Sequence, residues 1–305
     1  MQIAMVGLGR MGGGMVERLR RGGHDIVVYD IDPAAVAEAV ATGVRGVASL
    51  EALVAALEPP RAVWVMVPAG HITQAVLGDL AALLSSGDVC VDGGNSKWSD
   101  SAAQAAIFAG KDIAFVDAGV SGGVWGLEHG YCLMVGGTPE GYAILEPVLR
   151  TLAPQGGGLA HVGAAGAGHF TKMVHNGIEY AMMQAYAEGF ELLRAAPFGI
   201  DAGTAAEVWQ TGSVVRSWLL DLAVRALQED PALDRLSGYV EDSGEGRWAV
   251  EAAVELGIPA PAMTLALFTR FSSREPNAFS NRMLAALRQQ FGGHAVRMDP
   301  SQTAS

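Results

Sequence analysis

Short runs of β-branched and other apolar residues alternate with stretches rich in alanine and leucine through the first half of this 305-residue chain. Most of these runs are apolar throughout, which is typical of strands buried on both faces of a sheet. Because helical stretches separate them, we expect a mostly parallel, doubly wound sheet of the α/β class. The predicted strands are Gln2–Val6, Ile26–Tyr29, Ala62–Val67, Asp88–Val91, Ile113–Asp117, Tyr131–Val135 and Leu159–Val162.

The pattern changes after Gly163, where strand-like runs end and helical periodicity continues to about Phe291. A long helix over Ala167–Ala195 is predicted to open this part, and glycine and proline residues punctuate the remainder of the chain. We therefore place a domain boundary near residue 164. The prediction is an α/β domain at residues 1–164 followed by an all-α domain at residues 165–305.

Charge and composition exclude several kinds of partner. The formal net charge is -12, and such a surface repels nucleic-acid phosphates. No apolar run approaches the ~20 residues of a membrane-spanning helix, and the first residues lead into a strand rather than a signal peptide. The two cysteines, Cys90 and Cys132, each lie in an apolar run, which predicts buried free thiols in a reducing compartment. We expect a cytoplasmic protein that binds neither nucleic acid nor membranes.

A glycine-rich turn follows the first predicted strand and leads into a helix. Glycines at the first, third and sixth positions of this turn permit a tight bend and close approach of a pyrophosphate to a helix N-terminus. Asp30 ends the second predicted strand, at the distance where an acid binds the adenine ribose. Since a carboxylate repels a 2′-phosphate and no arginine follows it, we predict a Rossmann-type domain that binds NAD rather than NADP. The turn comprises Gly7, Leu8, Gly9, Arg10, Met11 and Gly12.

Three further loops follow later predicted strands: Pro68–Gly70, Asp92–Ser96 and Ser121–Gly123. In a doubly wound sheet the carboxyl ends of the strands share one edge, where ligands bind. Taken singly, each loop is also compatible with an ordinary turn. Taken together, they predict the wall of a site that offers backbone amides, a hydroxyl and a side-chain amide.

The predicted long helix carries a polar stripe bordered by apolar residues. At ~100° per residue, Lys172, His175, Asn176 and Glu179 lie on one face, with Tyr180 at its edge. A solvated surface face is the simpler explanation, but the apolar border favours a ligand-facing stripe. A lysine can act as the base in alcohol oxidation when burial and nearby positive charge lower its pKa. No cluster of aspartate, histidine or cysteine suggests a divalent metal.

These residues make the chain resemble the family of decarboxylating 6-phosphogluconate dehydrogenases, in a short form with a single helical domain. The resemblance extends over nearly the whole chain. Its most specific segments are Asp92–Ser96, Val120–Gly123, Gly168–Tyr180 and the late Arg288–His294.

The resemblance implies a function and a set of roles. The expected reaction oxidises and decarboxylates 6-phosphogluconate to ribulose 5-phosphate with reduction of NAD, as in gluconate metabolism and the pentose phosphate pathway. Lys172 is implied as the base at the C3 hydroxyl and Glu179 as the acid at C1, with Asn176 beside them. The residues implied for the carboxylate and hydroxyls are Asn95, Ser121, Gly122, Gly123, His175 and Asn176, and those implied for the phosphate end are Tyr180, Arg270, Arg288 and His294.

The resemblance also implies a homodimer or higher homo-oligomer, because Arg288 and His294 come from the neighbouring subunit in the family. The chain departs from the family pattern at two places. Ser243 stands where long forms carry a phosphate-binding lysine, and Gly14 stands where an asparagine is common. The helical stretch with Val214, Leu219, Leu222 and Leu227 offers a candidate apolar face for a second copy.

Two other functions remain open. One is the NAD-dependent oxidation of a small 3-hydroxy acid without decarboxylation. Glu179 and the Arg288–His294 segment argue against it, because such a substrate needs neither a proton donor at C1 nor a phosphate clamp. The other is an NAD-binding sensor without catalysis, which would have no need of Lys172 on the stripe.

Overall fold

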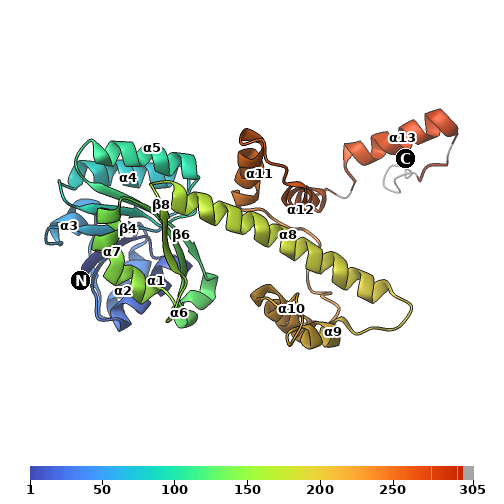
Figure 1. The fold of residues 1–305 in the computed structure, drawn as a ribbon, viewed down its shortest axis with the longest axis horizontal. Helices are drawn as coiled ribbons and strands as arrows, with labels where there is room; N and C mark the ends of the chain where they lie inside the picture. The colour runs from blue at the N-terminus through green and yellow to red at the C-terminus, as the bar shows by residue number, and fades with distance from the viewer. Residues whose placement is uncertain (276, 294, 298–305) are drawn as a thin grey trace. The chain divides into compact units, whose positions relative to one another are not determined.

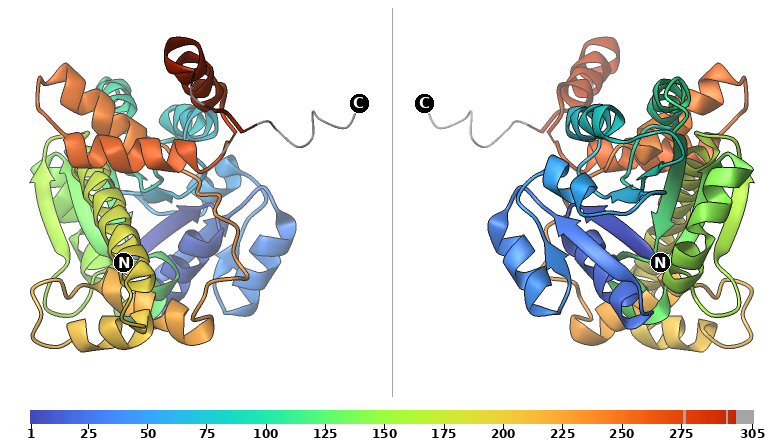
Figure 2. Two further views of the ribbon diagram at one scale, coloured as in Figure 1. Left: turned by 90° about the vertical axis from the view of Figure 1, so that its right-hand side faces the viewer. Right: turned by 90° about the vertical axis from the view of Figure 1, so that its left-hand side faces the viewer.

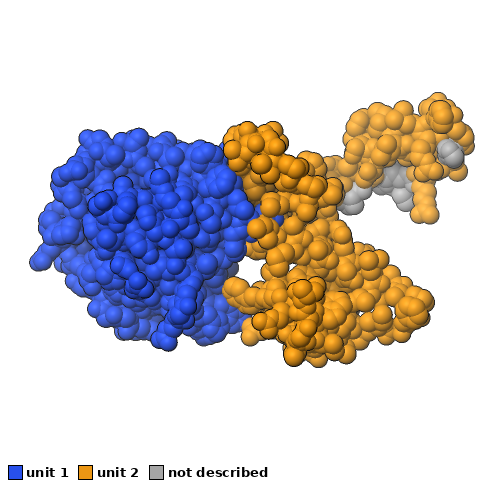
Figure 3. All heavy atoms as spheres, viewed as in Figure 1, with its two compact units in different colours: residues 1–177 blue, residues 178–305 orange. Residues whose placement is uncertain are grey.

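The computed structural model describes residues 1–275, 277–293 and 295–297, and its chain alternates strands and helices before continuing as helices (Figure 1). It divides into two compact units, residues 1–177 and the residues from 178 on (Figure 3). The boundary between these units lies within one long helix. The turn at residue 164, where the sequence suggested a domain boundary, immediately precedes that helix.

The strands are β1 (Gln2–Val6), β2 (Asp25–Tyr29), β3 (Arg45–Gly46), β4 (Ala62–Val65), β5 (Val89–Asp92), β6 (Ala114–Ser121), β7 (Cys132–Gly137) and β8 (Leu159–Gly163). The helices of the first part are α1 (Arg10–Arg21), α2 (Pro33–Ala41), α3 (Leu50–Ala55), α4 (His71–Leu83), α5 (Trp98–Ala109), the 3-10 turn η1 (Gly123–Trp125), α6 (Gly126–His129) and α7 (Pro139–Leu152). The later helices are α8 (Ala167–Ala195), α9 (Ala202–Trp209), α10 (Trp218–Glu229), α11 (Glu245–Glu255), α12 (Pro261–Ser272) and α13 (Phe279–Gly292).

All eight strands form one sheet in the order β3-β2-β1-β4-β5-β6-β7-β8. The first six are parallel and follow the order 3-2-1-4-5-6 of dinucleotide-binding folds. The chain reverses at β7, which pairs antiparallel to β6, and β8 pairs parallel to β7. The order of strands switches direction between β1 and β4, so the loops that follow these two strands flank the crevice where ligands bind in such sheets.

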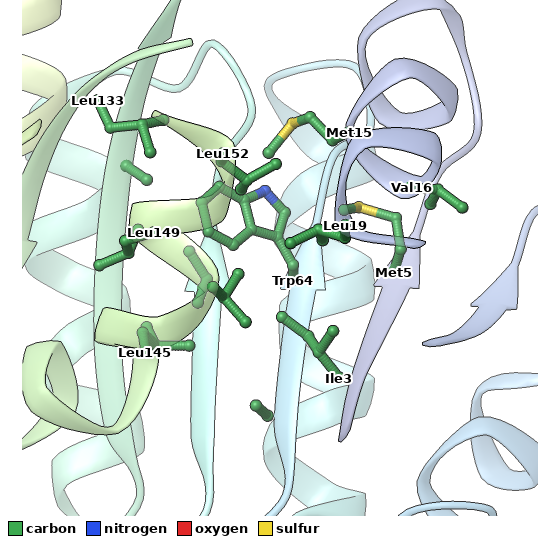
Figure 4. Packing of buried hydrophobic residues seen from close by; sticks show 14 of the residues in the cluster. Ile3, Met5, Met15, Val16, Leu19, Trp64, Leu133, Leu145, Leu149 and Leu152 are labelled. Atoms are coloured by element: carbon green, nitrogen blue, oxygen red, sulfur yellow. The ribbon is translucent and has the colours of Figure 1, made fainter. Parts of the chain in front are cut away.

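Helices cover both faces of the sheet (Figure 1, Figure 2). On one face, α1 and α7 pack against alternate residues of the strands around the fully buried Trp64 (Figure 4). On the other face, α3, α4 and α5 pack against the intervening residues, such as Val63 and Cys90. Alternate strand residues therefore enter different cores, which explains why the strand sequences are continuously apolar. The doubly wound α/β fold predicted from the sequence is confirmed.

The second unit is helical in its described part and has small cores of its own. Leu220, Val224 and Leu227 of α10 pack with α9 and with two aromatic residues of α8, Tyr186 and Phe190. A second cluster joins α12 to Tyr180 of α8. None of the described helices is long and apolar enough to span a membrane.

Three sequence-based expectations need correction. The two-residue strand β3 was missed, because so short a pair shows no periodicity. Cys132 is exposed rather than buried, because it is the first residue of β7. The apolar residues proposed for a second copy do not form one exposed helix face: Leu227 of α10 is buried within this chain, and Val214 is 98% exposed but lies before the helix begins.

Candidate active site

The turn after β1 has a glycine wherever a side chain would interfere. Gly7 has φ +96°, a conformation that favours glycine, and a Cβ there would overlap the carbonyl oxygen of Met66. A Cβ at Gly12 would overlap the carbonyl oxygen of Gly7, so this glycine lets α1 pack closely on the turn. A Cβ at Gly9, by contrast, would have no atom within 4 Å. The open space therefore lies at the N-terminus of α1, where no side chain caps the helix and a pyrophosphate fits.

Asp30 follows β2 and lies beside this turn. Its Oδ2 accepts a 2.6 Å hydrogen bond from the amide of Leu8, and its Oδ1 accepts a 2.9 Å bond from the amide of Asp32. The carboxylate thus joins the end of β2 to the glycine turn and retains lone pairs for ribose hydroxyls. The next side chain, Ile31, is 91% exposed and carries no charge that could bind a 2′-phosphate. These residues fit the ribose end of a nicotinamide dinucleotide.

The departure at Gly14 has a local structural reason. A Cβ at this position would lie 2.6 Å from the hydroxyl oxygen of Tyr131. Tyr131 is fully buried, and its ring also packs against the backbone of Gly126, just after the Ser121–Gly123 loop. The Tyr131 hydroxyl therefore fills the space that a side chain at position 14 would occupy. The same tyrosine joins α1 to the segment after β6.

The loops after β5 and β6 are held by their own strands. Oδ1 of the buried Asp92 accepts a 3.0 Å hydrogen bond from the amide of Gly94, which fixes the turn that presents the half-buried Asn95. Strand β6 runs further than predicted and includes Ser121 as its last residue. Gly122 and Gly123 follow with φ of +137° and +51°. After β4, the carbonyl of Pro68 accepts a 2.8 Å bond from Thr73 Oγ1.

Lys172 lies in the second turn of α8, and its Nζ donates a 2.7 Å hydrogen bond to Oδ1 of Asn176. Nδ1 of His175 lies 3.0 Å from the same oxygen. Asn176 is 8% exposed, whereas Lys172 and His175 are half-buried. The side-chain amide of Asn176 therefore orients two residues of the predicted stripe.

Strand β6 approaches Lys172 closely through Gly119. A Cβ at Gly119 would overlap the Cβ of Lys172 and would lie 2.8 Å from the carbonyl oxygen of Gly168. Because side chains alternate along a strand, Gly119 and Ser121 share one face of β6. The first unit therefore places Lys172 against the strand that ends at Ser121.

Asp117 and His169 were missed by the sequence analysis. The fully buried Asp117 accepts hydrogen bonds from the amides of Gly166 (2.7 Å) and His169 (2.8 Å) at the start of α8. Nδ1 of His169 lies 2.6 Å from Ser101 Oγ on α5. An aspartate that ends a strand of apolar residues was the available signal, because an ionised side chain in a buried strand needs partners.

In the second unit, Tyr180 of α8 is 5% exposed. Its hydroxyl accepts a 3.2 Å hydrogen bond from the amide of Ser243, and the guanidinium carbon of Arg270 lies 3.5 Å from the centre of its ring. Arg270 also donates to the carbonyl of Glu241 at 2.9 Å. Tyrosine and arginine are thus brought together as one group, which can offer a hydroxyl and a cation to an anion.

Ser243, the second position where the chain departs from the family pattern, also has defined contacts. Ser243 Oγ donates a 2.7 Å hydrogen bond to Glu245, whose side chain is buried at the start of α11. Next to it, a Cβ at Gly246 would lie 2.5 Å from the Tyr180 ring. The segment therefore packs on Tyr180, and at the position where the resemblance implies a lysine in long forms it carries the Ser243 hydroxyl, bound to Glu245.

The remaining predicted residues have separate locations. Glu179 is half-buried and lies seven residues after Lys172 on α8, so helix geometry puts both on one face. Arg288 is exposed on α13, a helix that contributes no buried residue. His294 lies outside the described residues. Within the described part of the chain, no three or more His, Cys, Asp or Glu side chains gather to hold a metal ion.

A Rossmann-type unit whose last helix carries the Lys172–Asn176 pair, followed by a helical unit, defines a dinucleotide-binding protein of the dehydrogenase class. Two family models match the chain: the NAD-binding domain of 6-phosphogluconate dehydrogenase over residues 2–192, and the C-terminal domain of the same enzyme over residues 168–303. The chain belongs to the 6-phosphogluconate dehydrogenase family.

Relatives and solved structures agree with this assignment. The chain is 44% identical to a putative 6-phosphogluconate dehydrogenase of Bacillus subtilis, over 97% of this chain and 99% of that one. It is 42% identical to an NAD(+)-dependent, decarboxylating 6-phosphogluconate dehydrogenase of Haloferax volcanii, over 97% and 98%. The structure of Plasmodium falciparum 6-phosphogluconate dehydrogenase superposes with a TM-score of 0.84 at 26% identity, covering 98% of this chain and 67% of that one. A Mycobacterium tuberculosis 3-hydroxyisobutyrate dehydrogenase superposes with a TM-score of 0.73 at 27% identity, covering 89% and 94%.

Proposed function

We propose that this chain catalyses the NAD-dependent oxidative decarboxylation of 6-phosphogluconate to ribulose 5-phosphate and carbon dioxide. The observation that carries the proposal is the hydrogen bond from Lys172 to Asn176, on a helix packed against the strand that ends at Ser121. A lysine in this place can exchange a proton with a substrate hydroxyl. The relative from Haloferax volcanii, which is named for this reaction with NAD, supports the same substrate and cofactor.

The proposed roles follow from the chemistry of the side chains. NAD, when bound at the glycine turn and Asp30, supplies the acceptor for the hydride. Lys172 takes the proton from the C3 hydroxyl as that carbon is oxidised, and its ammonium group then polarises the new ketone while the neighbouring carboxylate leaves as carbon dioxide. Glu179, on the same face of α8, delivers a proton to C1 of the resulting enediol.

We assign the distal end of the substrate to Tyr180 and Arg270. The guanidinium of Arg270 is held over the Tyr180 ring and by a backbone carbonyl, so its orientation is fixed before an anion binds. Arginine suits a phosphate because its planar fork donates paired hydrogen bonds. Because Ser243 stands where long forms of the family carry a lysine, and its hydroxyl is bound to Glu245, we expect Arg270 to take a larger share of the phosphate contact here.

We propose a homodimer, or a larger assembly built on it, in which α13 and the residues after it complete the neighbour's phosphate site. Phe279, Leu284 and Leu287 of α13 are all more than half exposed, and Phe291 is 95% exposed. An apolar helix left so open is typical of a surface that a partner covers. Arg288 lies on this helix, so α13 can carry a cation to the neighbouring site.

A steady-state assay tests the function. With 6-phosphogluconate and NAD, we expect NADH and carbon dioxide to appear in equal amounts, and we expect no comparable turnover of gluconate or 3-hydroxyisobutyrate. Formation of NADH without carbon dioxide would contradict the proposed decarboxylation. Faster turnover of 3-hydroxyisobutyrate than of 6-phosphogluconate would favour the small-acid dehydrogenases, to which the fold is also similar.

A further inference from the structure

Helix α8 begins without a capping side chain of its own, because the residue before Ala167 is Gly166. Asp117 of β6 takes that place from another part of the sequence. Its two carboxylate oxygens accept the amide of Gly166, which precedes the helix, and the amide of His169, the third helical residue. These are the same two amides that a capping box satisfies within one helix. A negative charge at this end also interacts favourably with the helix dipole.

His169 connects the capped start of α8 to helix α5. Its ring is 2% exposed, and Nδ1 lies 2.6 Å from Ser101 Oγ on α5 and 3.9 Å from Oδ2 of Asp117. Ser101 is itself 1% exposed, so the contact is closed to solvent. Nε2 of His169 is buried without a hydrogen-bond partner among the described residues. All of the ring's polar contacts in the described structure are therefore on its Nδ1 side, toward Ser101 and Asp117.

The same face of β6 continues from this cap to Lys172. Asp117, Gly119 and Ser121 alternate along the strand and share one side of it. Asp117 binds the first turn of α8, and Gly119 contacts the second turn at the Cβ of Lys172. A shift of the first turn along β6 must therefore move Lys172 relative to Ser121.

We propose that Asp117 is a positioning residue that, together with the Ser101–His169 contact, fixes α8 on β6 and thereby sets the location and hydrogen bond of the Lys172 ammonium. Asp117 acts through the backbone of the helix and not on a substrate. The consequence for catalysis rests on the proposed function, but the consequence for Lys172 itself does not. The two can be tested separately.

Lysine labelling gives a test that needs no activity, because the chain contains only three lysines: Lys97, Lys111 and Lys172. The intact protein without substrate is treated briefly with acetic anhydride, and mass spectrometry gives the rate at each lysine. In Asp117→Asn, one of the two amides at the start of α8 faces the NH₂ group of the new side chain. We expect Lys172 to react about fivefold faster relative to Lys97 and Lys111, the ratio that corresponds to losing about one ordinary hydrogen bond.

Asp88→Asn is the matched control. Asp88 is also a buried aspartate whose carboxylate accepts hydrogen bonds from two backbone amides, those of Arg61 at 2.7 Å and Ser85 at 2.9 Å. It immediately precedes β5, so it lies at the amino ends of the parallel strands. We expect this variant to lose thermal stability and to keep the wild-type labelling ratio. An unchanged Lys172 ratio in a folded Asp117→Asn protein would overturn the proposal. If Asp117→Asn does not fold, Ser101→Ala replaces it, with the same expected rise and the same overturning result.

Kinetics extend the test to the reaction. With 6-phosphogluconate, Asp117→Asn should lower kcat by about tenfold or more, because small misplacements of a catalytic group are costly. The KM for NAD should stay within about twofold, since a general loss of structure, and not a displaced lysine, would weaken dinucleotide binding. A wild-type protein inactive on 6-phosphogluconate would count against the proposed function alone, because the labelling ratio would still decide the role of Asp117.

Discussion

Lys172 donates a 2.7 Å hydrogen bond from Nζ to Oδ1 of Asn176, one turn further along α8. The acceptor is a neutral amide oxygen, which orients the ammonium group along the polar stripe of the helix. His175 also lies against this oxygen, at 3.0 Å. The pair gives the Lys172 ammonium group a defined direction, which the proposed proton transfer requires.

The first prediction concerns this lysine. Lys172→Met should lower kcat by at least about 10²–10⁴-fold, which is what a general acid or base contributes. The Kd for NADH, measured by fluorescence titration, should stay within about twofold of wild type because the dinucleotide turn is distinct from Lys172. Lys111→Met is the control, since Lys111 donates to the carbonyl of Ala81 on α4. A Lys172→Met enzyme with a tenth of normal activity would remove this lysine from the mechanism.

The second prediction concerns cofactor choice. Asp30 binds the amide of Leu8 and brings a negative charge to the place where a 2′-phosphate would need a cation. We expect kcat/KM with NAD to exceed that with NADP by about tenfold or more, a difference of about 1.4 kcal/mol. Asp30→Ala should reduce this ratio, while Asp25→Ala, at the other end of β2, should leave it unchanged. Equal use of both cofactors by the wild type would contradict the assignment to NAD.

The third prediction concerns the phosphate end. Arg270→Met should raise the KM for 6-phosphogluconate by about tenfold or more, because a charge-assisted hydrogen bond contributes about 1.5–3 kcal/mol. The KM for NAD should not change. Arg194→Met is a matched control in the second unit, because Arg194 likewise donates to a backbone carbonyl, that of Ala232, at 3.1 Å. An unaltered KM for 6-phosphogluconate in Arg270→Met would place the phosphate elsewhere.

The fourth prediction concerns the shared site. Lys172→Met and Arg288→Ala should each be inactive alone, and they should complement each other when unfolded and refolded together. Each mixed dimer would then contain one site with both residues intact, provided that Arg288 acts on the neighbour. Turnover is measured after native mass spectrometry has verified the mixed dimers. Mixed dimers without activity would place Arg288 in the same subunit as Lys172 or outside the site.

The fifth prediction concerns stability and pH. The hydrogen bond from Arg247, at 2.6 Å, together with Arg274 holds the pKa of Asp242 well below its usual range. A depressed folded-state pKa stabilises the fold above the unfolded pKa of about 3.9, and that stabilisation is lost as the pH falls toward the folded pKa. Asp242→Asn should lower the free energy of unfolding by about 1–2 kcal/mol at pH 7. Urea unfolding should show a smaller difference below about pH 4, and a constant difference would exclude the ionised carboxylate as its cause.

Much of the fold could be predicted because its signals are local. Seven of the strands are recognisable from runs of apolar residues, and α8 begins and ends where the sequence pattern does. The glycine turn could be interpreted in the same way, because the spacing of Gly7, Gly9 and Gly12 directly after a strand is a local pattern. The stripe on α8 follows from helical spacing alone, so Lys172 and Asn176 are expected on one face from the sequence.

Other features depend on which distant residues meet, and no local pattern encodes that. The antiparallel pairing of β7 with β6 and the exposure of Cys132 at the start of β7 are two features of this kind. Asp117 and His169 are far apart in the sequence, yet packing of α8 onto β6 makes the aspartate the cap of that helix. The sequence by itself determined which residue types line each strand and each helical face, because periodicity is a property of a single element. Only the tertiary structure decided that Gly119 lies against Lys172 and that Asp117 caps α8, because buried polar groups take whichever partner the packing brings within hydrogen-bond distance.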